Sequence, residues 1–206
     1  MTVGGARSRP AIAAWVLAGA AAAAPGVARA QGGALPPHLA DRAKLCFTCH
    51  GENGRSSIVG TPSLAGQPQL FLENRLVLIR EGLSPIDAMK GMLDLFDDAE
   101  LSALAGHFSR LAPPPAAAPR DEARAERGRR LAERALCVSC HLPDPRGRDQ
   151  IPRLAGQRED DLLATMRALL AGKAPGRDTA MTNALGGLGD RDLLDLAHHL
   201  ATLASP

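Results

Sequence analysis

Aromatic side chains are nearly missing from this chain of 206 residues. It contains no tyrosine, one tryptophan (Trp15) and four phenylalanines. The length fits two small domains or one medium domain. Small domains with so few aromatic side chains need another source of core volume, and a bound cofactor would supply it.

An excess of charge of either sign is also missing. The formal net charge is +2, from 24 basic and 22 acidic residues. Residues 1–30 hold three arginines and no acid, so the rest of the chain has 21 basic and 22 acidic residues, a net charge of −1. A near-neutral chain gives no support for a nucleic-acid partner.

No segment after residue 30 is long and apolar enough to cross a bilayer. Before it, the chain has the three-part pattern of a secretory signal peptide, with a basic start, an apolar run and a small-residue cleavage site (Arg7 and Arg9; 11–24; Ala28 and Ala30 before Gln31). We predict export, with cleavage after Ala30. The alternative is an uncleaved N-terminal anchor. Ser8 separates the two arginines, so no twin-arginine signal is evident.

The chain consists of two halves that repeat each other in order. The matched segments are "LCFTCH" (45–50) with "LCVSCH" (136–141), "PSLAGQ" (62–67) with "PRLAGQ" (152–157), and "LFDDAELSALAGHFSRLA" (95–112) with "GLGDRDLLDLAHHLATLA" (187–204). The offset between matched positions stays between 90 and 92. We therefore predict two domains of one type, 31–111 and 121–206, joined by a Pro/Ala linker at 112–120.

Each half is predicted to be helical, with one helix running into the Cys motif, a middle helix at about 68–81 or its counterpart, and a last helix at about 98–111 or its counterpart. Apolar residues of the last helix recur at i, i+3, i+4 and i+7, and Asp97 with Glu100 suits an N-cap and its partner. No segment alternates with period two. The predicted class is therefore all-α, with three to four helices per domain around one bound group.

Cys-x-x-Cys-His is the attachment pattern of c-type haem. Residues three apart on a helical turn share a face, so both sulfurs can reach the two vinyl groups of one haem, and the histidine that follows points at the iron. We predict two covalent haem c groups, held by Cys46 and Cys49 with His50, and by Cys137 and Cys140 with His141. The alternatives are two disulfides, a redox dithiol or a zinc site. The repeat disfavours a zinc site, because each pair serves its own half.

The second axial ligand is predicted to be a methionine. With the last helices aligned at an offset of 92, Met89 matches Met181, whereas Met92 matches Ala184. Met181 is the only methionine of its half that is predicted to lie in a loop, whereas Met166 falls on a middle helix and is predicted to be core. The alternative is a second histidine, since His107 and His199 also match. We interpret those two as helix-surface or haem-edge residues because they lie within the last helices.

These motifs resemble a class I c-type cytochrome domain, and two of them behind a signal peptide resemble the cytochrome c4 family of periplasmic dihaem electron carriers. The resemblance implies thioether bonds at the four cysteines, and iron ligation by His50 with Met89 and by His141 with Met181. It also places the carbonyls of Pro62 and Pro152 against the histidine Nδ1 atoms. The loop "CHLPDPRGRD" departs from the family pattern, so its shape is expected to differ.

The resemblance implies transfer of single electrons between redox proteins in the periplasm. The expected donor is a quinol-oxidising complex or a dehydrogenase, and the expected acceptor is a terminal oxidase or a reductase. Peripheral contact with a membrane is compatible with this role. The alternatives are the dihaem subunit of a flavocytochrome that oxidises sulfide, or a dihaem peroxidase or thiosulfate-oxidising enzyme, which needs one haem with an open or exchangeable distal site.

Overall fold

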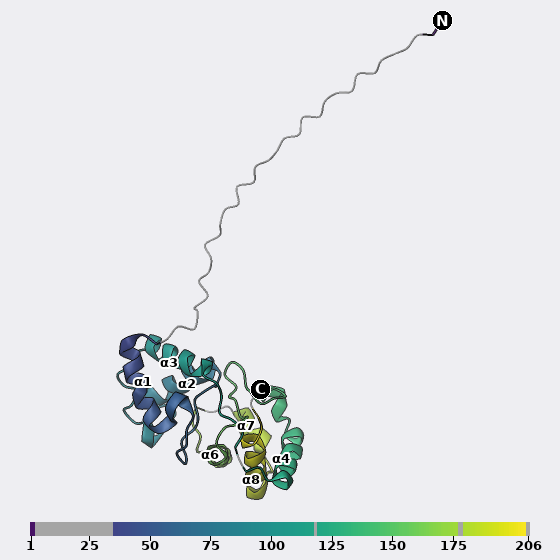
Figure 1. Cartoon of the computed structure of the whole chain (residues 1–206). Coiled ribbons are helices and arrows are strands. Elements are labelled where there is room, and N and C mark those ends of the chain that lie inside the picture. Colours follow the sequence, from purple (N-terminus) through teal and green to yellow (C-terminus); the bar gives the residue numbers. More distant parts are fainter. Residues whose placement is uncertain (3–34, 118, 177–178, 205–206) are drawn as a thin grey trace. The chain divides into compact units, whose positions relative to one another are not determined.

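The computed structural model describes residues 1–2, 35–117, 119–176 and 179–204, so the predicted signal peptide lies almost wholly outside the described residues. The helices run in the order α1 (Pro37–His50), η1 (Glu52–Gly54), α2 (Gln69–Arg80), η2 (Asp87–Met89), α3 (Asp98–Arg110), α4 (Glu122–Arg134), α5 (Cys137–His141), α6 (Glu159–Leu170), α7 (Thr179–Leu185) and α8 (Asp190–Ala201) (Figure 1). The described part contains one isolated β-bridge, Arg148 with Ile151, and no strand. The predicted all-α class is confirmed.

The first half builds its core where α1 and α2 pack on α3 (Figure 1). Leu101 and Leu104 of α3 are fully buried together with Leu39 of α1. The predicted cap of α3 is present, because Asp97 Oδ1 accepts from the Glu100 N–H at 2.8 Å and Glu100 Oε2 accepts from the Asp97 N–H at 3.1 Å. This capping box fixes where the last helix begins.

The second half packs α4 and α6 on α8. Met166 of α6 is buried in this core, as predicted. The predicted continuous helix into the second Cys motif is wrong, because α4 ends at Arg134 and α5 begins at Cys137. Leu136 between them takes the left-handed conformation (φ 53°, ψ 32°), which redirects the chain. In the first half, α1 runs unbroken from Pro37 to His50.

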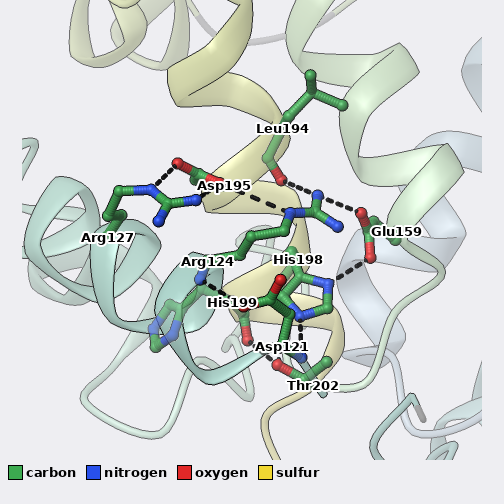
Figure 2. Close-up of polar contacts among 9 residues, drawn as sticks. All are labelled: Asp121, Arg124, Arg127, Glu159, Leu194, Asp195, His198, His199 and Thr202. Atoms are coloured by element: carbon green, nitrogen blue, oxygen red, sulfur yellow. Dashed lines mark hydrogen bonds and ion pairs between the residues drawn. The ribbon is translucent and has the colours of Figure 1, made fainter. Parts of the chain in front are cut away.

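A network of hydrogen bonds and ion pairs joins α4 to α8 (Figure 2). Asp195 is buried on α8 and accepts from Arg127 Nε at 2.6 Å and Nη2 at 3.0 Å, while Arg124 bonds Glu159 at 2.7 Å. His198 Nδ1 lies 2.8 Å from Glu159 Oε2, and its Nε2 accepts from the Asp121 N–H at 2.9 Å. Because only two residues separate α4 from the Cys137 motif, this network also restrains the position of that motif.

Asparagine at position 195 is expected to cost about 2 kcal/mol of unfolding free energy at pH 7, because a buried carboxylate that pairs with arginine is lost. The Arg127 guanidinium lowers the pKa of Asp195, against the opposing effect of burial. That stabilisation is present above the unfolded-state pKa of about 3.9 and disappears as the pH falls through the lower folded value. The difference between wild type and Asp195→Asn should therefore shrink below about pH 4 in guanidinium unfolding curves.

Asp190→Asn is the matched control for this prediction. Asp190 is also on α8 and also accepts two hydrogen bonds from one arginine, Arg167, at 2.6 and 2.7 Å. Both side chains of this pair are exposed, at 62% and 48%. An exposed pair contributes about 0.2–1 kcal/mol, so the control should fall well short of Asp195→Asn. Equal costs at the two positions would contradict the role given to burial.

Candidate functional site

The four cysteines of the repeated motif lie on α1 and α5, and no disulfide joins them. Cys46 and Cys137 are half-buried, whereas Cys49 and Cys140 are exposed. Burial raises the pKa of the Cys46 and Cys137 thiols. In the described part of the chain, no three His, Cys, Asp or Glu side chains gather as a metal ion would need.

The two motif histidines are held in the same way. His50 and His141 are buried, and their Nδ1 atoms lie 2.8 Å from the Pro62 carbonyl oxygen and 2.9 Å from the Pro152 carbonyl oxygen. A carbonyl only accepts, so Nδ1 carries the proton and donates, and Nε2 keeps its lone pair. Burial lowers the pKa of both histidines, which favours the neutral form that binds metals.

In the second half the histidine and the predicted methionine face each other. Nε2 of His141 lies 3.5 Å from Sδ of Met181. Met181 was predicted to lie in a loop, but it lies on the short helix α7. The segment "TAMTNAL" contains no Gly or Pro and forms the whole of α7, whereas its counterpart "DAMKGML" leaves the helical conformation at Lys90 (ψ 126°), just before Gly91 (φ 76°).

In the first half, the two candidate methionines differ in burial. Met89 ends η2 and packs half-buried against the core cluster that contains Leu39 and Leu101. Met92 is 43% exposed. The half-buried Met89 is therefore the better placed of the two for an apolar pocket.

The competing histidines contact other groups. His107 of α3 packs its ring 5.4 Å from the Phe108 ring and 6.4 Å from the Phe47 ring, between centroids. His199 was interpreted as a helix-surface or haem-edge residue. It is not on the surface, because it is buried beneath Gly128 of α4. That helix crossing could not be seen in the sequence of α8 alone.

The loops that follow the two motifs share one geometry, although their sequences differ. The Gly54 carbonyl accepts from the N–H groups of residues 64 and 65 at 2.8 and 3.0 Å, and the Pro145 carbonyl accepts from residues 154 and 155 at 2.8 and 3.1 Å. The residue after the histidine also takes nearly the same conformation in both halves, with Gly51 at φ 82° and Leu142 at φ 73°. The expected difference in shape lies within the loops, since the first contains the 3-10 helix η1 and the second contains the β-bridge of Arg148 with Ile151.

Comparisons with known proteins agree with this geometry. A family model described as cytochrome c matches residues 125–204. Cytochrome c4 of Pseudomonas aeruginosa is 32% identical over 139 residues, which cover 64% of this chain and 68% of that protein. The chain belongs to the cytochrome c4 family. The crystal structure of reduced recombinant cytochrome c4 from Pseudomonas stutzeri superposes with a TM-score of 0.73 and 26% identity, over 81% of this chain and 97% of that one.

A second relative, with a similar sequence identity, has another name. It is the thiosulfate dehydrogenase electron acceptor of Thiomonas intermedia, 34% identical over 160 residues, covering 72% of this chain and 71% of that protein. As a cytochrome c4 family member, the chain is a dihaem electron-transfer protein with two covalently bound haem c groups, and it is not an enzyme. The family's members are periplasmic or membrane-associated, and no described helix is long and apolar enough to cross a membrane.

Proposed function

We propose that each half holds one haem through a matched set of side chains and passes single electrons at that haem. The first set is Cys46, Cys49, His50 and Met89, and the second is Cys137, Cys140, His141 and Met181. The observation that carries the proposal is the 3.5 Å approach of Met181 Sδ to His141 Nε2, with the opposite nitrogen bonded to the Pro152 carbonyl. This arrangement brings the free nitrogen of an oriented imidazole close to a thioether sulfur.

The chemistry that a haem with His/Met ligation supplies is one-electron transfer at a raised reduction potential. The side chains proposed here do three things for it. The cysteines would fix its position, the buried imidazole would offer the Nε2 lone pair in an orientation set by the proline carbonyl, and the methionine would offer its sulfur as a second ligand. If the chain itself supplied both ligands, no position would be left for a substrate, which supports a carrier and disfavours a peroxidase.

The domain division and the export route are part of the same proposal. We assign 1–30 to a cleaved signal peptide, 31–111 and 121–206 to the two cytochrome domains, and 112–120 to the linker. The match of a cytochrome c model to residues 125–204 supports the second domain. Attachment of haem c takes place outside the cytoplasm, and we therefore place the protein in the periplasm.

Redox proteins are the proposed partners, with a quinol-oxidising complex or a dehydrogenase as donor and a terminal oxidase or reductase as acceptor. One observation favours a second candidate, an acceptor dedicated to a thiosulfate dehydrogenase, since a relative has that name at 34% identity. Stopped-flow mixing of the ferric protein with a thiosulfate dehydrogenase and thiosulfate tests whether the protein is a general carrier or this dedicated acceptor. Rapid reduction favours the dedicated acceptor, and no reduction within minutes contradicts it.

Alanine at position 89 is expected to remove about half of the ferric protein's weak long-wavelength charge-transfer band, because one of two Met–iron bonds is lost. The band is followed by near-infrared magnetic circular dichroism during a redox titration. Met92→Ala is the matched control, three residues away and 43% exposed, and should leave the band intact. If Met92→Ala removes the band and Met89→Ala does not, the ligand assignment in the first half is wrong.

A further inference from the structure

The two repeated PxLAGQ segments bind each other across the interface between the halves. Gln157 of the second half accepts from the Ser63 N–H through Oε1 at 2.9 Å and donates to the Ser63 carbonyl through Nε2 at 2.9 Å. Gln67 of the first half does the same to Arg153, with Oε1 accepting from its N–H at 2.9 Å and Nε2 donating to its carbonyl at 3.0 Å. All four residues are buried. The interface is therefore self-complementary, with one glutamine from each half.

Each glutamine binds the peptide group that holds a motif histidine of the other half. The N–H of Ser63 and the carbonyl of Pro62 belong to one peptide unit, and that carbonyl is 2.8 Å from His50 Nδ1. Likewise, the N–H of Arg153 and the carbonyl of Pro152 form the unit that lies 2.9 Å from His141 Nδ1. A continuous chain of hydrogen bonds therefore runs from each histidine, through one peptide, to a glutamine of the opposite domain.

Hydrogen bonds in such a chain strengthen one another, because an acceptor on the N–H side of a peptide makes its carbonyl oxygen more negative. A more negative carbonyl draws the Nδ1 proton of the histidine more strongly, which makes Nε2 a stronger donor to metal. A stronger donor favours ferric over ferrous iron, so the hydrogen bonds from the glutamine to the histidine lower the reduction potential. A glutamine that turns away would raise it.

We propose that Gln67 and Gln157 are positioning residues that act across the interface, Gln157 on the histidine of the first domain and Gln67 on the histidine of the second. The proposal rests on His50 and His141 being the haem ligands proposed above. Docking of a redox partner that shifts one domain against the other would then change both potentials through these contacts. The repeated glutamine has this role in addition to joining the domains.

The test is a crossed pattern of midpoint potentials in the holoprotein. Gln157→Leu should raise the potential of the first-domain haem, and Gln67→Leu should raise that of the second. The expected size is about threefold to tenfold in the one-electron equilibrium constant, where tenfold is about 59 mV. Met89→His and Met181→His identify the two waves, because each should move only one. If neither methionine variant moves a wave, the proposed iron ligation is wrong and this inference fails with it.

Ser84→Ala is the matched control for a general loosening of the interface. Ser84 Oγ donates to the Pro175 carbonyl at 2.8 Å across the same interface. This hydrogen bond is not part of the two hydrogen-bonded paths that reach the histidines. Ser84→Ala should leave both potentials unchanged. Gln157→Glu keeps an oxygen acceptor for the Ser63 N–H, so the first-domain haem should stay at or below its wild-type potential even if Gln157→Leu fails to fold. Equal shifts of both haems in either leucine variant, or a rise in Gln157→Glu, would overturn the inference.

Discussion

Histidine in place of Met181 is expected to lower the midpoint potential of the second-domain haem by about 0.2 V, a quarter of the roughly 0.8 V range that axial ligands span. Two nitrogen donors stabilise ferric iron more than one nitrogen and one thioether do. Position 181 is well placed for the exchange, because Met181 Sδ already lies 3.5 Å from His141 Nε2. A spectroscopic redox titration should show one wave displaced and the other unchanged.

Met166→Leu is the control for this variant. Met166 is the other methionine of the second half, and its side chain is 6% exposed in the core on α6. A swap of similar volume there should cost less than about 1.5 kcal/mol and move neither wave. If Met166→Leu changes a potential as strongly as Met181→His does, the effect comes from packing, and Met181 is not the ligand.

Much of this fold follows from local sequence. The period of apolar residues and the Asp97 cap predicted a last helix at 98–111, and α3 spans Asp98–Arg110. The predicted middle helix separated Met166 from Met181, and the structure puts Met181 beside His141 and Met166 in the core. The assignment of Met181 to the iron remains a proposal.

Other features depend on contacts that no local pattern encodes. The break between α4 and α5 needs a left-handed leucine, Leu136, which intrinsic preferences disfavour. The glutamines of the PxLAGQ segments were visible only as repeated letters. Their partners lie about ninety residues away in the sequence, in the opposite half, so only the folded structure shows that each reaches a peptide bonded to a motif histidine.

Alanine in place of Gly128 is expected to lower the unfolding free energy by about 3 kcal/mol. Gly128 lies at the crossing of α4 and α8, where an added Cβ would meet the Asp195 carbonyl oxygen at 2.2 Å and the His199 Cβ at 2.5 Å. Both obstacles belong to the backbone or its first carbon, so no side-chain rotation relieves them. The gain of about 1 kcal/mol in helix propensity is too small to offset the overlap.

Gly106→Ala tests whether the crossing itself is the cause. Gly106 is also inside a helix, α3, but the atoms nearest to an added Cβ there are the ends of the Arg110 and Gln69 side chains, at 3.1 and 3.4 Å. Those side chains can move, so the propensity gain should leave stability unchanged or slightly higher. Guanidinium unfolding followed by circular dichroism measures both variants.

Gly128→Ala forces α4 to move away from α8, and α5 follows α4 after only two residues. The variant should therefore also disturb the second haem more than the first. Equal effects on the two haems would contradict this account of the crossing.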